Sequence, residues 1–230
     1  MNDEAQCSLE ELNQAAEELI ALGCAASAMH IHDGVARLGF LGEVSAFVDE
    51  VIEDVKEGVI SAAEGVAVFW EEQQELRDKV LFYGVNGITV VGGATQVELG
   101  VAITGASYGV GTPFGAMLVA HGANNIYEGV GNIINGPNSQ GAVVGPVRYL
   151  YQQRSNSIYE GNMAYGAVDL ILSGGGLVRA IRKKESVQLF LQDPMNCEMS
   201  YRQAGKIALS LEGVVDALTM YSMNRETANR

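Results

Sequence analysis

Basic residues are scarce in this sequence. Lys and Arg together number 14 against 28 Asp and Glu, which gives a formal net charge of −14 over 230 residues. Residues 1–83 hold 18 of the acids and four basic residues, so this part alone is as negative as the whole chain. Nucleic-acid phosphates repel such a surface, and the basic clusters elsewhere are too small to reverse that. The composition therefore argues against a nucleic-acid partner.

Cysteines are also few, and they suggest no cross-link. Cys7, Cys24 and Cys197 are odd in number, lie far apart and form no CxxC pair. Neither a disulfide framework nor a zinc site is expected, and the thiols are typical of a cytosolic protein. Residues 1–11 are acidic and polar, whereas a signal peptide has a basic start and an apolar core. If the protein leaves its cell, we expect a dedicated secretion machine to export it.

The chain lacks a recognisable catalytic motif. Residues 109–115 do not match the GxGxxG fingerprint, and no predicted strand precedes them. His30, His32 and Asp33 include metal-ligand types, but a third ligand group at useful spacing is missing, so this HxHD cluster is more typical of a helix end. His121 stands alone among small residues and is interpreted as a packed or lumen-facing imidazole. We expect no metal, no cofactor and no enzyme activity.

The middle of the chain lacks charge and is rich in glycine. Residues 85–147 contain no Lys or Arg, and their acids are Glu98 and Glu128. Several glycines recur at intervals of seven residues, which places them near one line along a helix. Glycine costs about 1 kcal/mol per helical position relative to alanine, so such a stripe is useful only where backbones pack closely. The packing candidates are Gly93, Gly100, Gly105, Gly109, Gly115, Gly122 and Gly129.

The apolar periodicity predicts an all-α protein. Ser8 and Glu11 form a capping box for a first helix. Apolar residues at three- and four-residue steps predict a long amphipathic helix over 44–66, which runs on, with a bend, through Val80. Gly84 and Gly87 are expected to break the chain there. A helical hairpin follows, with a helix over 88–107, a turn and a helix from Pro113 to 134. Further helices are predicted over 158–184 and 199–223, with a short strand candidate at Val187, Leu189 and Leu191.

Three regions follow from these patterns: an acidic amphipathic helical region (1–83), a glycine-rich apolar hairpin (84–147) and a C-terminal helical region (148–230). We expect them to form one compact domain. The hairpin is either the tightly packed centre of a soluble protein or a membrane-inserting element, and both descriptions hold in turn for a protein that is soluble first and membrane-bound later.

Polar residues decide whether the hairpin enters a membrane. An acidic residue at the centre of a membrane helix costs about 2.5 to 3.5 kcal/mol, so neither hairpin helix is expected to insert alone. In an assembly, the polar side chains would face a shared aqueous lumen, and carboxylates there would favour cations. The predicted pore-lining residues are Glu98, Glu128, Gln96, Asn124 and Asn125.

A basic cluster lies near the end of the predicted helix over 158–184. Each cation near an anionic membrane surface contributes about 1 kcal/mol to binding. The alternative is an ordinary charged helix end. The predicted contacts with lipid headgroups are Arg179, Arg182, Lys183 and Lys184.

The segment from Gly84 to Gly145, with apolar helices punctuated by glycine behind an acidic helical half, resembles the small glycine-rich helical effectors that bacteria deliver into rivals by type VI secretion. Several of these effectors act as ion-conducting pores. The resemblance covers the middle and C-terminal parts of the chain and supplies no fixed residue motif. It implies a cytoplasmic producer, contact with a secretion-system component, a cognate immunity protein and depolarisation of the inner membrane of the target cell.

The sequence therefore predicts an antibacterial toxin that inserts, forms a homo-oligomer and conducts ions. Two alternatives stay open. One is an enzyme toxin without a recognisable motif, which would kill without loss of membrane potential. The other is a soluble helical protein that binds a partner, which would be harmless in the periplasm.

Overall fold

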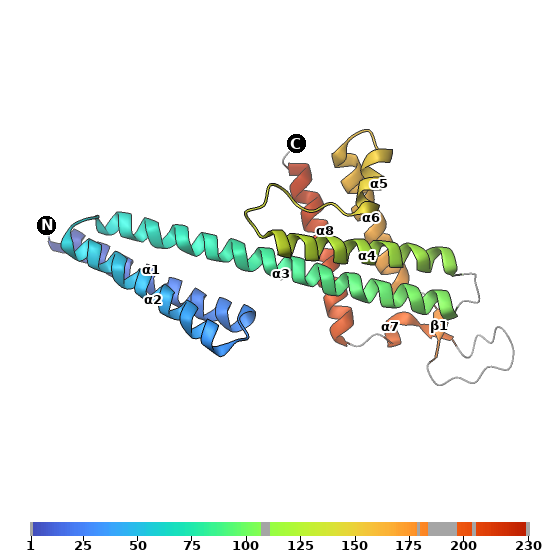
Figure 1. The fold of residues 1–230 in the computed structure, drawn as a ribbon, viewed down its shortest axis with the longest axis horizontal. Coiled ribbons are helices and arrows are strands. Elements are labelled where there is room, and N and C mark those ends of the chain that lie inside the picture. Colours follow the sequence, from blue (N-terminus) through green and yellow to red (C-terminus); the bar gives the residue numbers. More distant parts are fainter. Residues whose placement is uncertain (1, 107–110, 179, 184–196, 204–205, 229–230) are drawn as a thin grey trace. The chain divides into compact units, whose positions relative to one another are not determined.

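The computed structural model describes residues 2–106, 111–178, 180–183, 197–203 and 206–228, and this part of the chain is almost entirely helical. The predicted all-α fold is confirmed (Figure 1). The helices are α1 (Asn2–His30), α2 (Gly34–Glu57), α3 (Ala62–Ala106), α4 (Thr112–Asn135), α5 (Pro146–Arg154), α6 (Ile158–Leu177), α7 (Ser200–Gln203) and α8 (Lys206–Ala228). Two short strands, β1 (Ala180–Arg182) and β2 (Cys197–Met199), pair in antiparallel fashion.

The chain divides into two compact units rather than one domain. The first unit is Met1–Tyr83 and the second is Gly84–Arg230. The division falls where the sequence changes from highly charged to nearly uncharged. The regions 84–147 and 148–230, which the sequence analysis separated, share the second unit. Helix α3 contributes its residues 62–83 to the first unit and 84–106 to the second.

The first unit packs α1, α2 and the beginning of α3 around one apolar core. Phe69 is fully buried and meets the ring of Phe47 edge-on at a centroid distance of 6.2 Å. The buried Gln73 donates a hydrogen bond of 3.1 Å from its amide to the carbonyl of Ala15, which ties α3 to α1. The buried core residues are Leu12, Ala15, Ala16, Leu19, Val48, Val51 and Phe69.

The amphipathic helix predicted over 44–66, with a bent continuation to Val80, is wrong, because the chain breaks at Gly58. Helix α2 ends at Glu57, and Gly58 takes a left-handed conformation with φ of 75°, which glycine adopts without steric cost. The Gly58 N–H donates back to the carbonyls of Asp54 and Val55 and so closes the helix. Helix α3 starts at Ala62, and the acidic faces of α2 and α3 belong to separate helices.

A capping box starts α3 and makes its stability depend on pH. The Glu64 carboxylate accepts hydrogen bonds from the Ser61 backbone N–H at 2.7 Å and from its hydroxyl at 2.8 Å. These bonds favour the charged carboxylate and lower the pKa of Glu64, the backbone bond most. The stabilisation is present above the unfolded pKa of glutamate and is lost as pH falls through the lower, folded pKa. NMR titration should show this lowered pKa, and Ser61→Ala should move it back toward 4.5; an unchanged titration would contradict the hydrogen-bonded cap.

The predicted break at Gly84 and Gly87 is also wrong, because α3 continues through both glycines to Ala106. Two glycines cost about 1 kcal/mol each in a helix, and this cost does not stop a helix that tertiary packing holds. The packing comes from α4: Val90 and the Asn86 carbonyl lie against Gly129. Glycine marks the end of α2 because the chain turns there, whereas the glycines of α3 keep helical geometry.

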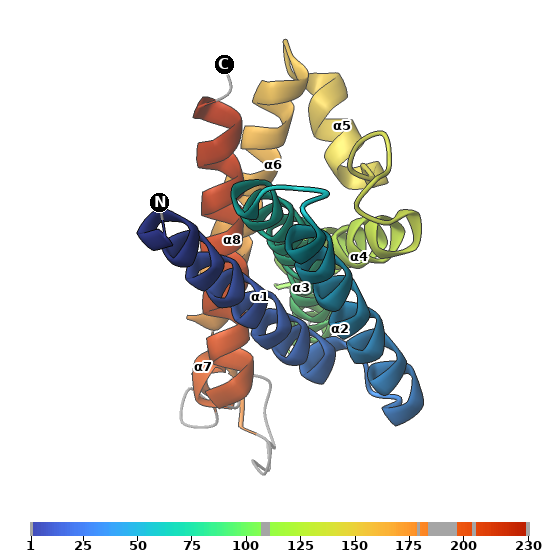
Figure 2. The same ribbon diagram turned by 90° about the vertical axis from the view of Figure 1, so that its left-hand side faces the viewer.

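The second unit contains the central hairpin and the helices after it. Helix α4 (Thr112–Asn135) matches the predicted helix over 113–134. Helix α6 packs against both α5 and α8 (Figure 2). The helix predicted over 158–184 ends early, at Leu177, because β1 pairs with β2 directly afterwards. The strand candidate at Val187, Leu189 and Leu191 lies outside the described residues.

Candidate functional site

Glycines set the distance between α3 and α4, which run antiparallel (Figure 1). A Cβ added at Gly93 would lie 2.5 Å from the Gly122 carbonyl oxygen, and one at Gly122 would lie 2.5 Å from the Gly93 carbonyl oxygen. Gly100 and Gly115 face each other in the same way at 2.6 Å. No side chain fits between these backbones, so the two helices touch main chain to main chain.

The remaining packing candidates are placed differently. A Cβ at Gly129 would meet Val90 of α3 at 2.7 Å, so Gly129 belongs to the same interface. No heavy atom of the described residues lies within 4 Å of a Cβ added at Gly105, so this glycine does not serve the packing seen there. Gly109 lies outside the described residues.

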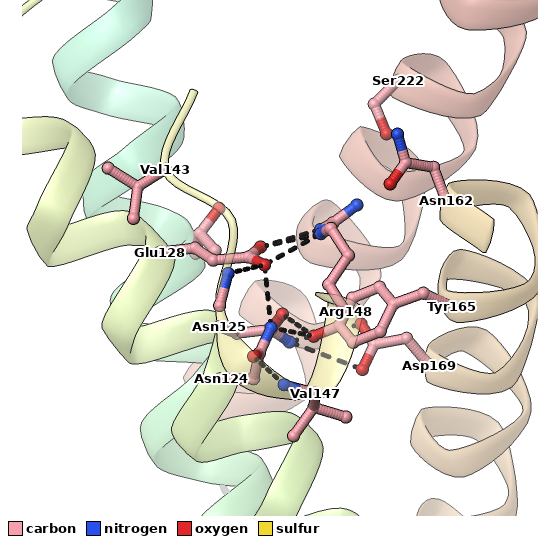
Figure 3. Close-up of polar contacts among 12 residues, drawn as sticks. Asn124, Asn125, Glu128, Val143, Val147, Arg148, Asn162, Tyr165, Asp169 and Ser222 are labelled. Carbon is pink, nitrogen blue, oxygen red and sulfur yellow. Dashed lines mark hydrogen bonds and ion pairs between the residues drawn. The ribbon is translucent and has the colours of Figure 1, made fainter. Parts of the chain in front are cut away.

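A network of buried polar side chains fills the space between α4, α5 and α6 (Figure 3). At one end, Arg148 of α5 forms a bidentate ion pair with Glu128 of α4 through contacts of 2.8 to 3.1 Å. Glu128 also accepts from the Gly145 N–H at 2.8 Å and from Asn124 at 2.9 Å. The Arg148 guanidinium lies over the ring of Tyr165 at 4.3 Å from its centroid.

At the other end, Asp169 of α6 contacts polar groups from two other helices, α3 and α4. Its carboxylate accepts from the amide of Gln96 at 3.2 Å and from that of Asn125 at 3.3 Å, and His121 Nδ1 lies 3.2 Å away. Asn125 also donates to Gln96 at 3.0 Å and accepts from the Tyr165 hydroxyl at 2.6 Å. The Tyr165 hydroxyl therefore connects this end of the network to the Glu128 end, because it also accepts from Asn124.

The imidazole of His121 is held by contacts with protein groups on several sides. It is 2% exposed, stacks on Tyr165 at a centroid distance of 4.7 Å and places Nε2 3.3 Å from the Tyr151 hydroxyl. Both ring nitrogens therefore contact protein groups, Nδ1 the Asp169 carboxylate and Nε2 the Tyr151 hydroxyl. Among the described residues, no buried side-chain polar atom lacks a hydrogen-bond partner. The network therefore joins the helices through hydrogen bonds and through the Arg148–Glu128 ion pair.

The predicted pore-lining residues do not share one lumen in this structure. Gln96, Asn124, Asn125 and Glu128 are buried in the polar network, where they bond to side chains of the same chain. Glu98 is exposed and lies outside the network. In this chain, protein groups satisfy these four side chains, and the lining of a lumen in an inserted assembly stays a prediction.

Helix α4 has its polar side inside and its apolar side outside. Its buried residues include His121, Asn124, Asn125 and Glu128. The exposed residues between positions 113 and 134 are Pro113, Ala116, Met117, Ala120, Ala123, Tyr127, Val130, Ile133 and Ile134. This is the reverse of an amphipathic helix on a water-soluble protein.

The neighbouring helices repeat this arrangement. In α6 the described exposed residues after Glu160 are Ala167, Ile171 and Gly174, while Asp169 and Ser173 are buried. In residues 84–106 of α3, Glu98 is the one exposed charged side chain among those described. The outer surface of these helices is therefore nearly free of charge.

The predicted headgroup cluster is only partly described. Arg179 and Lys184 lie outside the described residues, Arg182 is the last residue of strand β1, and Lys183 is exposed. Arg182 and Lys183 therefore do not lie at the end of a helix, since α6 stops at Leu177.

The HxHD cluster lies at a helix junction. His30 is the last residue of α1, and the carboxylate of Asp33 accepts from the Ala36 N–H at the start of α2. No group of three or more His, Cys, Asp or Glu suited to a metal occurs among the residues that the structure describes.

Sequence reasoning missed Asp169, Arg148 and Tyr165. Asp169 had a usable signal, because it is an isolated carboxylate in an otherwise apolar helical stretch, and such a residue needs a partner once buried. Arg148 and Tyr165 carried no comparable signal. They become recognisable only when α5 and α6 are placed against α4.

One described helix, spanning Ala62–Gly105, is long and apolar enough to cross a membrane by length and composition. A family model described as "Protein of unknown function (DUF4225)" matches residues 51–194. This match covers most of the chain, including the hairpin, α5 and α6. No curated protein and no solved structure matches the sequence.

Proposed function

We propose that this chain, which belongs to the DUF4225 family, is an antibacterial toxin whose second unit enters the membrane of a target cell and conducts cations across it. The observation that carries the proposal is the reversed polarity of α4, with apolar side chains outside and His121, Asn124, Asn125 and Glu128 inside. A helix surrounded by lipid has this distribution, because polar residues there face the interior of the helical bundle.

The lengths of the helices suit a bilayer. At 1.5 Å per residue, the 24 residues of α4 extend about 36 Å and the 20 residues of α6 about 30 Å. The hydrocarbon core of a bilayer is about 30 Å thick. Residues 84–106 of α3 form a segment of similar length, whereas the preceding residues 62–83 carry many charges and suit water.

The polar network provides the hydrogen-bond and ion-pair partners that polar side chains would not find in lipid. Glu128 and Asp169 would each oppose insertion as isolated carboxylates, but Arg148 and His121 lie against them, and amides complete their hydrogen bonds. In hydrocarbon each unsatisfied polar group costs several kcal/mol. A pre-assembled unit therefore enters lipid at lower cost than α3 or α4 alone.

Conduction requires a path for ions, and we assign its charged residue as Glu98. A bare carboxylate at the centre of a membrane costs about 2.5 to 3.5 kcal/mol, so an inserted chain gains by turning Glu98 toward water. In a homo-oligomer, copies of Glu98 would gather around a shared aqueous path and favour cations. The four other predicted pore-lining residues hold the unit together rather than line this path.

The biological setting follows the resemblance described above. The toxin is made in the cytoplasm of the producing cell, is delivered by type VI secretion and acts at the inner membrane of the target cell. A cognate immunity protein protects the producer. The glycine-rich hairpin supports this setting, and the toxicity is by depolarisation without catalysis.

Planar bilayers test conduction and the part played by Glu98. Purified chain added to one side should give a current whose reversal potential under a KCl gradient indicates cation selectivity. Glu98→Gln should move the reversal potential toward zero, because the carboxylates that attract cations are gone. Glu160→Gln is the matched control, since Glu160 is an exposed acid at the start of α6, and it should leave selectivity unchanged.

Expression in the periplasm with a potential-sensitive dye extends the test to cells. Loss of membrane potential before growth stops supports the pore. Killing with the potential intact would favour the enzyme alternative, and harmless expression would favour a soluble binding protein. Intact bilayers that stay electrically silent at every pH and voltage tried would overturn the proposal.

A further inference from the structure

A groove on the first unit has features of a binding site. It lies between α1 and α3 and has a volume of about 470 Å³. One side is formed by Trp70, the only tryptophan of the chain, whose side chain is 61% exposed. Glu18 of α1 and Glu71 of α3 lie along the same groove.

Trp70 is not part of the apolar core of this unit. The preceding residue, Phe69, is the aromatic side chain that fills the core, and it is 0% exposed. Trp70 points away from that core, on the helix face that also carries Gln74 and Arg77. Tryptophan is the residue type most enriched at the energetic centres of protein interfaces, where its large ring is covered by a partner.

The charge of the first unit indicates which kind of partner side chain would cover Trp70. Residues 1–83 carry 18 acids and four basic residues. Within the groove, Glu18 and Glu71 face one basic residue, Arg77, and the guanidinium of Arg77 donates to the Gln73 amide oxygen at 3.5 Å. The groove therefore combines an open aromatic face with excess negative charge, which complements a cationic side chain.

We propose that this groove binds a Lys- or Arg-bearing segment of a partner protein. A cation placed over the Trp70 ring gains cation–π attraction, and the carboxylates of Glu18 and Glu71 pair with it or with a neighbouring cation. Gln74 offers an amide for the partner's main chain. The site goes beyond the proposed pore, because it lies in the first unit and needs no membrane.

Intrinsic fluorescence tests the site directly, because Trp70 is the only source of tryptophan emission. The full chain is titrated in aqueous buffer with a helical peptide of Lys and Ala, and with a Glu–Ala peptide of equal length. The Lys–Ala peptide should shift and quench the emission in a saturable, salt-sensitive way. The Glu–Ala peptide should leave it unchanged.

Variants then separate this groove from general attraction to an acidic protein. With a fluorescein-labelled Lys–Ala peptide, anisotropy should show that Trp70→Ala weakens binding about fivefold, the equivalent of about 1 kcal/mol. Glu18→Gln with Glu71→Gln should weaken binding, and Arg77→Gln should strengthen it. The matched control is Glu50→Gln with Glu53→Gln, which removes the same charge from exposed positions on α2.

Two results would overturn the site. One is equal weakening by the control pair and by the groove pair, which would mean that the peptide senses only net charge. The other is Trp70 emission that stays constant while the labelled peptide binds, which would place binding elsewhere. Neither result affects the pore proposal, because these measurements contain no lipid.

Discussion

Replacing Gly93 with alanine is expected to destabilise the second unit by about 3 kcal/mol, the upper end of the usual cost of overpacking. The added Cβ would lie 2.5 Å from the Gly122 carbonyl oxygen and 3.0 Å from the backbone nitrogen of Ile126. These are main-chain atoms, so no rotamer change relieves the clash. The helices must separate, and the neighbouring contact between Gly100 and Gly115 then loosens as well.

Gly87→Ala is the matched control, because it makes the same substitution in the same helix. In the part of the chain that the structure describes, nothing lies within 4 Å of a Cβ added at Gly87, so the variant should gain about 1 kcal/mol from helix propensity. Urea denaturation followed by circular dichroism at 222 nm measures both changes. Trp70 emission serves as an internal reference for the first unit and should not move. If both variants shifted stability in the same direction, backbone contact between α3 and α4 would be refuted.

Asp169→Ala is expected to cost about 3 kcal/mol or more, because each buried polar group left without its partner costs about 1 to 3 kcal/mol. The substitution removes the acceptor for Gln96 and Asn125 and the neighbour of His121, and it leaves their donors buried. Asp169→Asn keeps one acceptor oxygen and should lose less. Denaturation as above measures both variants.

Glu98→Ala is the control for Asp169→Ala, because Glu98 is an acid of the same unit with an exposed side chain. Its effect should stay within about 0.5 kcal/mol. Comparable losses for Asp169→Ala and Glu98→Ala would show that the network does not hold the helices together. A large loss for Asp169→Ala alone would support the hydrogen bonds to Asp169 as the contacts that hold these helices together.

The helix content could be predicted where local signals are strong. Pro113 at the start of α4 and Gly136 at its end bracket a clear apolar period, and the predicted helix agrees with α4 within one residue at each end. The break predicted at Gly84 and Gly87 was wrong because glycine occurs both at the ends of helices and inside them. It ends a helix only where the chain takes a positive φ, as at Gly58, and φ at a glycine depends on the surrounding packing.

The polar network could be predicted only in part. The amides and the carboxylate of α4 could be recognised from the sequence because they interrupt an apolar segment. The prediction that they line a lumen assumed that water must complete their hydrogen bonds. Their actual partners, Arg148, Tyr165 and Asp169, lie 20 or more residues away from Glu128 and on other helices. Only the tertiary structure shows that these side chains complete one another's hydrogen bonds.

Because the glycines are spaced seven residues apart, α4 could slide along α3 by about two helical turns and still place glycine against glycine. Sliding α4 by seven residues, about 10 Å, would set Gly100 against Gly122 and Gly93 against Gly129, so the backbones would again meet without obstruction. Such a slipped hairpin would pull Asn125 away from Gln96. The hydrogen bond between the Asn125 and Gln96 amides therefore fixes one alignment among those that the glycine spacing permits. A chain without these amides would form a mixture of hairpins with different alignments.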